Sequence, residues 1–210
     1  MQLDSEKVKQ FQRAVGADAD GSFGPATLNL GLAYIAVHGG TEAPEPPVVV
    51  TPPTPTGAVD ARSEAIIATL HPMVQQPFRD LLHAINAAVS HLGVTGKWIS
   101  GYRNEAQQNA EVAAGFSHAP WPHSAHNGGG GTVGFACDLG WFDANGRYVE
   151  KESATAIAIK IDRAMGFHPG ADFGDFDHHC KRPPSMDAMG ENEFIKELIR
   201  RHENGIPLWP

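Results

Sequence analysis

The chain has 210 residues, of which 41% are hydrophobic and 19% charged, and its formal net charge at pH 7 is −8. This length accommodates one domain together with a small additional module. Such an acidic chain, without a cluster of lysine and arginine, argues against a nucleic-acid partner, because binding to a polyanion depends on basic patches that release counterions.

The N-terminal residues 1–7 contain no basic segment followed by an apolar one, so no secretory signal is predicted. No apolar run approaches the roughly 18 residues that a spanning helix requires. We therefore expect a monomeric protein that is made in the cytoplasm and has no membrane partner. In that compartment Cys137 and Cys180 are expected to be free thiols, although a disulfide between them stays open.

The first periodic segment, residues 5–15, places Val8, Phe11 and Val15 on one helical face. A polar turn at residues 18–27 and an apolar helical stretch at 28–37 follow. The Asp-x-Asp-Gly pattern in the turn is compatible with a calcium loop of the EF-hand type. However, its twelfth position is Asn29 and not an acidic residue, which argues against calcium.

The sequences Lys-Gln-Phe-Gln-Arg-Ala-Val-Gly (9–16) and Asp-Gly-Ser-Phe-Gly-Pro-Ala-Thr (20–27) resemble the small three-helix peptidoglycan-binding domain. The resemblance implies that this region binds bacterial peptidoglycan. An alternative is a helical hairpin without a ligand, because glycines, Asp and Thr also serve turns and caps. The candidate wall-binding residues are Phe11, Asp20, Gly21, Phe23, Gly24 and Thr27.

Residues 42–58 are rich in proline and threonine, a composition that favours extended polyproline II and forms no packed core. We interpret this segment as a semi-rigid linker. It divides the chain into a peptidoglycan-binding module at residues 1–41 and a second domain at residues 59–210. A tethered pair of this kind raises the effective concentration of the second domain at a solid substrate.

The second domain begins with helical patterns at residues 63–70 and 74–92, the latter ending at Gly93. Residues 97–103 read as a strand entering a turn. Asn104 is expected to cap a helix that extends to about Ala114, with Gln107 as its capping partner.

Later in the chain, residues 133–142 read as a strand, and Asn145-Gly146 predicts a hairpin into residues 147–149. Ser153 is expected to cap an amphipathic helix that ends at Gly166. Residues 176–180 form a candidate short strand, and a closing helix is predicted from about Glu191 to His202. Helices around a small antiparallel sheet predict an α+β fold for this domain.

Strand alternation indicates which side chains share a face with the candidate ligand Asp138. In residues 134–139, the larger side chains alternate with small ones, and Asp138 shares its face with the small ones, which leaves room for a metal ion. The same alternation separates His178 from His179, so only one of this pair can easily face the site. Alternation alone leaves open which of the two histidines faces the site.

Four motifs occur in order: Ser-Gly-Tyr-Arg (100–103), Ser-x-His (124–126), Gly-x-Ala-x-Asp (134–138) and Asp-x-x-His (175–178). Their order and spacing resemble the family of zinc D,D-carboxypeptidases and L-alanyl-D-glutamate endopeptidases, which includes phage endolysins. The resemblance implies one Zn²⁺ held by His126, Asp138 and His178. The chain departs from the family by a glycine insertion at residues 128–131, which either bridges two ligands or forms a flexible lip.

By the same resemblance, Asp175 is the expected general base and then acid for the attacking water. Arg103 is expected to bind a substrate carboxylate or to stabilise the oxyanion, although an ordinary salt bridge is the alternative. The predicted function is hydrolysis of peptidoglycan stem peptides between L-alanine and D-glutamate after the membrane is opened. The alternatives are a D-Ala-D-Ala carboxypeptidase and a wall-binding protein without activity.

Overall fold

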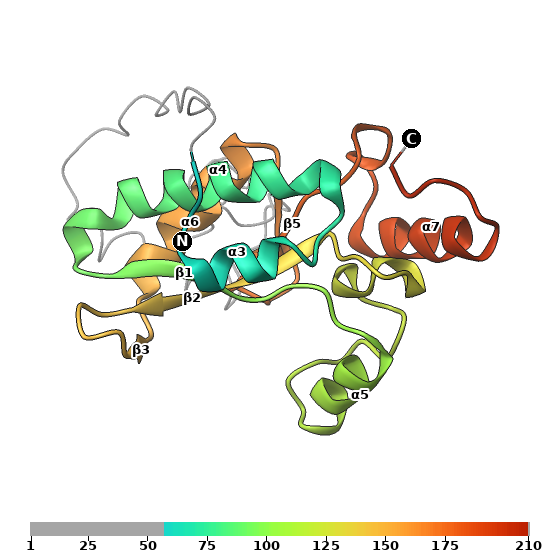
Figure 1. Ribbon diagram of the computed structural model, residues 1–210, viewed down its shortest axis with the longest axis horizontal. Coiled ribbons are helices and arrows are strands. Elements are labelled where there is room, and N and C mark those ends of the chain that lie inside the picture. Colours follow the sequence, from blue (N-terminus) through green and yellow to red (C-terminus); the bar gives the residue numbers. More distant parts are fainter. Residues whose placement is uncertain (1–56, 210) are drawn as a thin grey trace, which may run out of the picture. The chain divides into compact units, whose positions relative to one another are not determined.

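The computed structural model describes residues 57–209, which form an α+β domain with a small antiparallel sheet flanked by helices (Figure 1). This confirms the predicted class of the second domain. The predicted module at residues 1–41 and most of the predicted linker lie outside the described residues. All six candidate wall-binding residues, from Phe11 to Thr27, lie there as well.

The sheet has the strand order β1-β2-β5-β4, and β3 pairs with β2 off this path. The pairings between β1 and β2, β2 and β5, β4 and β5, and β2 and β3 are all antiparallel. The strand β2 is therefore central: it pairs with β1 on one side and with β5 on the other, and also with β3. The strands are β1 Thr95–Ser100, β2 Ala136–Phe142, β3 Tyr148–Val149, β4 His168–Pro169 and β5 His178–Cys180.

Five α-helices and several short 3₁₀ turns lie within residues 57–209. The α-helices are α3 Ala61–Ile67, α4 Pro72–Val89, α5 Glu105–Ala113, α6 Glu152–Ala164 and α7 Glu191–Glu203. The 3₁₀ turns are η1 Ser90–Leu92, η2 Ala125–Gly130, η3 Gly170–Asp172 and η4 Pro184–Met186. Within this part of the chain, no helix combines the length and apolar character needed to cross a membrane.

The helix termini test the predicted caps. Asn104 and Gln107 form the expected capping box at α5, each side chain accepting the other residue's backbone N–H. The predicted cap at Ser153 is wrong, because α6 already starts at Glu152 behind Lys151, which makes no side-chain cap bond. Ser153 therefore lies within the first turn, where a hydroxyl is not in the capping position.

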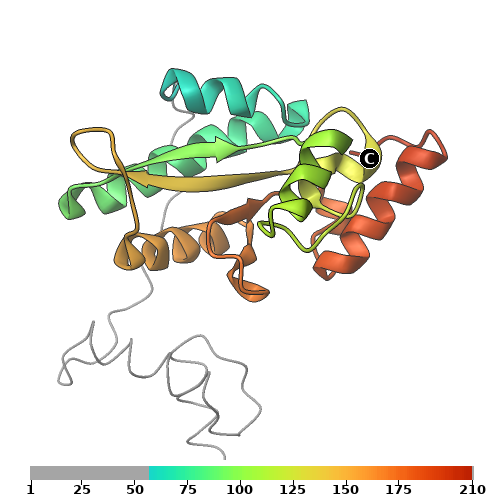
Figure 2. The ribbon, with the colours of Figure 1, turned by 90° about the horizontal axis from the view of Figure 1, so that it is seen from below.

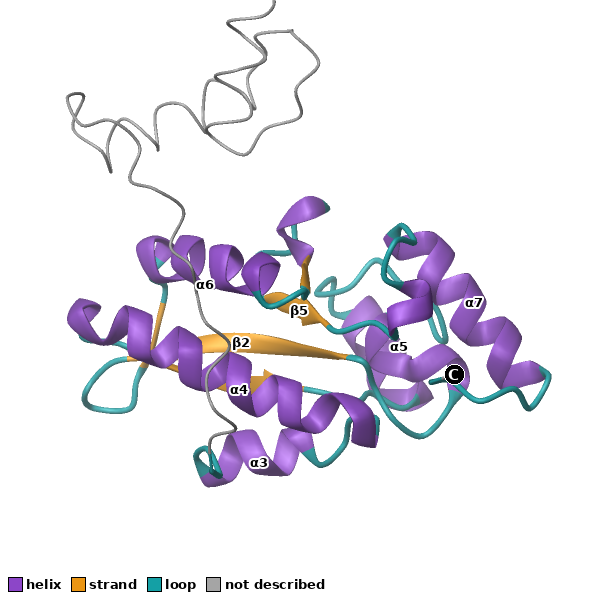
Figure 3. Ribbon diagram, turned by 90° about the horizontal axis from the view of Figure 1, so that it is seen from above, coloured by secondary structure: helices purple, strands orange, loops and turns teal. Residues whose placement is uncertain are grey.

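Two helices cover one face of the sheet. In Figure 3, α4 crosses over the strands and α6 runs beside it. The side chains on this covered face are buried, and they include Trp98, Cys137, Leu139, Trp141 and His179. Phe78 of α4 makes edge contacts with both Trp98 and Phe167, with ring centroids 5.3 and 5.1 Å apart. This packing forms the hydrophobic core of the domain.

The opposite face of the sheet is seen in Figure 2, with α4 behind it, α3 and α6 along its sides, and α5 at one end. We call it the open face. Because side chains alternate along strands, the register places on it Lys97, Ser100, Asp138, Gly140, Phe142, Tyr148 and His178. Asp138 and His178 are thus directed away from the hydrophobic core.

Candidate metal centre

Strand pairing brings Asp138 and His178 together. Asp138 of β2 lies directly opposite His178 of β5 in the antiparallel register, and directly opposed residues have Cβ atoms about 4.5–5.5 Å apart. His179 pairs with Cys137 and therefore faces the other way. The structure thus separates the two histidines, as alternation indicated, and places His178 beside Asp138, as the resemblance implied.

His126 reaches the same point from η2. The Ser124 hydroxyl accepts the His126 N–H, and Asn127 completes a capping box with Ser124. The His126 ring places Nδ1 at 2.7 Å from the Gly101 carbonyl oxygen. A carbonyl only accepts hydrogen bonds, so this Nδ1 carries the proton and Nε2 is left with a lone pair.

The donor atoms of the three side chains converge on one spot. His126 Nε2 lies 3.1 Å from Asp138 Oδ1 and 3.1 Å from His178 Nδ1. His178 Nδ1 lies 3.6 Å from Asp138 Oδ1. His126, Asp138 and His178 form the cluster of potential metal ligands in the described part of the chain, with all donor atoms within 4.8 Å of one another.

This arrangement fits a zinc ion. Tetrahedral coordination with bonds of about 2.0–2.1 Å puts ligand atoms about 3.3–3.4 Å apart, close to the separations between these donors. The His126 lone pair also faces a carboxylate oxygen at 3.1 Å, and two acceptors at that distance require a positive charge between or beside them. Two imidazoles, one carboxylate and an open position are typical ligands of catalytic zinc.

Without a metal, a proton supplies that charge. Burial lowers the pKa of His126, although the negative charge of Asp138 opposes this effect. Burial also disfavours protonation of His178, but hydrogen bonds to the side chains of Asp138 and Cys180 raise its pKa well above the usual value. Burial would raise the pKa of Asp138, yet the neighbouring histidines hold it well below its usual range. In the metal-free cluster, the contacts between the three side chains thus favour the ionised form of Asp138 and the protonated form of His178.

Arg103 lies at the edge of this cluster. Its Nη2 donates a hydrogen bond to Asp138 Oδ2, and its Nε donates to the Ser100 hydroxyl at 3.0 Å. The Arg103 side chain is only 17% exposed, so this contact differs from the surface salt bridge considered as its alternative. The guanidinium holds one carboxylate oxygen while the other faces the histidines.

Two further carboxyl groups precede His178. Asp175 lies in the turn that leads into β5, as strand alternation required, and its backbone N–H donates to the Gly170 carbonyl at 2.9 Å. Asp177 is exposed, but the loss of water around its carboxyl group, a hydrogen bond with Asp175 and repulsion by Asp138 raise its pKa to about 7. Sequence reasoning did not identify Asp177, because strand alternation alone would direct it away from His178.

The glycine insertion at residues 128–131 is a packed segment. Gly128 and Gly129 are buried and have φ values of 54° and 69°. A Cβ at Gly129 would lie 2.3 Å from the Leu198 carbonyl carbon of α7. Glycine is therefore required here both by its backbone conformation and by the close approach of α7. Of the two roles left open for the insertion, the flexible lip does not fit this packing.

On the covered face, His179 forms a second histidine–carboxylate pair. Its Nδ1 lies 2.6 Å from Asp162 Oδ2, and both side chains are almost completely buried. The edge of Trp98 closes this pair from one side. The two cysteines are both buried and unpaired with each other, which confirms the expectation of free thiols.

Comparisons with known proteins show similarity to solved structures only. No family model matches the chain, and no curated relative matches it. Among solved structures, the chain is similar to the crystal structure of the L-Ala D-Glu endopeptidase ChiX of Serratia marcescens, with 26% sequence identity and a TM-score of 0.42. The match covers 61% of this chain and 92% of that chain.

Proposed function

We propose that the described domain is a zinc peptidase that cuts peptidoglycan stem peptides between L-alanine and D-glutamate. The observation that supports this most directly is the convergence of donor atoms from His126, Asp138 and His178 at the open face of the sheet. The ordered motifs around these residues, which resemble those of wall-peptide hydrolases, favour a stem peptide as the substrate.

A zinc ion held by these three residues would polarise the scissile amide and activate water for attack. The chain prepares the ligands for this role. The Gly101 carbonyl fixes the tautomer of His126, and Arg103 orients the Asp138 carboxylate. Hydrogen bonds of this kind, made to the residues that bind a metal, set the orientation and basicity of those residues.

Proton transfer falls to Asp175 in this proposal. It would accept the proton of the attacking water and deliver it to the leaving amine. Asp177 shares a hydrogen bond with Asp175, so it positions that carboxyl and supplies a group whose protonation changes near neutral pH. Arg103 lies close enough to the ligand cluster to stabilise negative charge on the substrate oxygen.

Product analysis on purified sacculi tests the proposal. Zinc-loaded protein is expected to release fragments with a new D-glutamate amino terminus, and a chelator is expected to stop the release until zinc is restored. Release of free D-alanine would show a carboxypeptidase instead. Sedimentation with sacculi but no cleaved product at any zinc concentration would indicate a wall-binding protein.

We further propose that residues 1–41 bind peptidoglycan and that the linker at residues 42–58 tethers the peptidase to it. The protein would then act on the wall after the membrane of the producing cell has been opened. Phe23→Ala tests the module by itself. It is expected to weaken sedimentation with sacculi and to leave cleavage of a soluble muropeptide unchanged, and equal loss of both would contradict two separate modules.

A further inference from the structure

Two cations meet over one aromatic ring on the open face. The Lys97 ammonium of β1 lies 5.3 Å from the centroid of the Phe142 ring, and the Arg62 guanidinium of α3 lies 5.7 Å from it. Tyr148 packs edge-on against the same ring, with centroids 5.7 Å apart. Each cation is attracted by the ring, and the positive charge gathered around Phe142 can also attract an anion.

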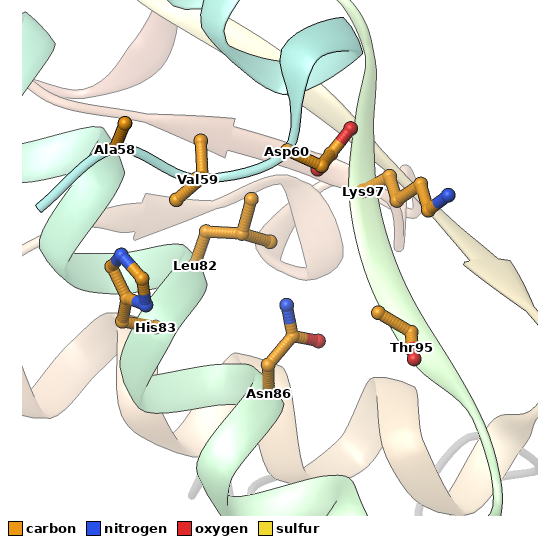
Figure 4. A pocket seen from close by; sticks show the side chains of 8 residues that line it. All are labelled: Ala58, Val59, Asp60, Leu82, His83, Asn86, Thr95 and Lys97. Atoms are coloured by element: carbon orange, nitrogen blue, oxygen red, sulfur yellow. The ribbon is translucent and has the colours of Figure 1, made fainter.

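Neither cation forms an ion pair with a described neighbour. Within residues 57–209, no carboxylate forms an ion pair with Arg62 or Lys97, whereas Arg79, Arg163, Arg182 and Arg200 each pair with one. Asp60 lies beside Lys97 in Figure 4, where its two carboxylate oxygens accept hydrogen bonds from the backbone N–H and the hydroxyl of Ser63. Figure 4 also shows Lys97 extending away from Leu82 and His83.

The cation pair is continuous with the metal centre. Lys97 pairs with Gly140, which is two residues from Asp138 on the same face of β2. With a rise of about 3.4 Å per residue, the Gly140 position lies about 7 Å, and the Phe142 position about 14 Å, from Asp138. Between them, the Ile99 and Tyr148 side chains lie close to Gly140. An extended peptide crosses the same span in two to four residues.

We propose that Arg62 and Lys97 together bind a carboxylate of the stem peptide, two to four residues from the bond that is cut. This inference rests on the proposed function and adds a determinant of substrate choice. The predicted ligand is a free carboxylate of the substrate at that distance from the bond. A charge-assisted contact with two cations distinguishes such a peptide from one that is neutral there.

Kinetics with two soluble muropeptides test the proposal. One is a muramyl tetrapeptide with free carboxylates at its third and fourth residues, and the other is the same peptide amidated at both. We expect the wild-type KM to be about tenfold lower for the free acid, with kcat equal within about twofold. The double variant Arg62→Gln/Lys97→Gln should lose this preference and leave the amidated peptide unaffected.

The control is Arg147→Gln/Lys160→Gln. It removes the same charge from two exposed cations that do not contact the Phe142 ring. It should keep the tenfold preference, which separates a local contact from the loss of net charge. If the wild type and Arg62→Gln/Lys97→Gln discriminate equally between the two peptides, the subsite does not exist.

Binding to metal-free protein separates this inference from the proposed function. Calorimetric titration in chelator is expected to show tighter binding of the free acid than of the amidated peptide, and Arg62→Gln/Lys97→Gln should abolish the difference. If zinc-loaded protein cuts neither peptide, the proposed function fails, and these titrations still decide the subsite. Equal affinities of the metal-free wild type for both peptides would overturn it.

Discussion

The two faces of the sheet carry the same pair of residue types with opposite surroundings. On the covered face, His179 and Asp162 are sealed beneath Trp98 and α6. On the open face, His178 and Asp138 meet a second histidine and an arginine. Adjacent residues of β5 thus contribute to a core contact and to a candidate metal centre.

This difference shows that a histidine–carboxylate pair has no fixed role. In the closed pair, His179 Nδ1 and Asp162 Oδ2 contact each other, while His179 Nε2 and Asp162 Oδ1 have no hydrogen-bond partner among the described residues. Removing one member would leave the other buried and unpaired, which destabilises a fold strongly. A pair with further donors around it and one open side can hold a cation. We therefore expect substitutions on the two faces to have separable effects on stability and on metal binding.

The largest expected effect is the loss of catalysis in His126→Ala. Removing one donor of the cluster should lower cleavage of sacculi by a factor on the order of 10³ or more, and dialysed protein should retain less zinc. Because His126 is buried, the metal-free variant should also be less stable than the metal-free wild type, so cleavage and zinc content are compared per folded molecule. Activity and zinc content at wild-type levels would contradict the assignment of the open face.

Asp162→Ala should have the reverse effect. Breaking the buried pair with His179 is expected to lower the free energy of unfolding by about 3–5 kcal/mol, as measured by denaturant titration. Zinc stoichiometry and kcat per folded molecule should stay close to wild type. A variant of normal stability that fails to bind zinc would show that the covered pair belongs to the site.

Gly129→Ala probes the support behind His126. Its Cβ would meet the backbone of α7 at Leu198, and the residue would also adopt a positive φ. Gly146→Ala is the matched control, since Gly146 has a φ of 74° and no atom within 4 Å of the added Cβ. The control should cost about 1 kcal/mol, and Gly129→Ala about 1–3 kcal/mol more. If both variants lose the same free energy of unfolding, α7 can shift away from the added Cβ without a measurable loss of stability.

The smallest effect concerns pH. The pKa of Asp177 is raised from 3.8 to about 7 in the folded protein, so the folded state holds this proton more tightly than the unfolded state. The resulting stabilisation is present below pH 4 and is lost as the pH rises to about 7. In metal-free protein, Asp177→Asn should therefore flatten the dependence of melting temperature on pH over this range, and an unchanged slope would contradict the shift.

Local patterns in the sequence predicted much of the sheet and the orientation of its ligands. Alternation along a strand is fixed by the backbone, so the shared face of Asp138 and its small neighbours could be read directly. The capping box at Asn104 is equally local. In contrast, the cap at Ser153 was misplaced, because residue type alone does not show where the first helical turn begins.

Contacts between distant segments could not be predicted in this way. The close approach of Leu198 to Gly129 joins α7 to η2. The local sequence of neither segment predicts this contact. Likewise, Arg103 was expected to face substrate, but its pairing with Asp138 follows from the path of the chain after β1. The convergence of Arg62 and Lys97 on Phe142 also depends on three separate elements.

The packing of α7 on the glycine segment has a consequence for the order of events during synthesis. His126 belongs to η2, whose buried glycines contact a helix that begins only at Glu191. A chain emerging from the ribosome contains all three candidate ligands before it contains that helix. The ligand loop then lacks its support, so the binding site is completed only when the final helix has been made and has docked.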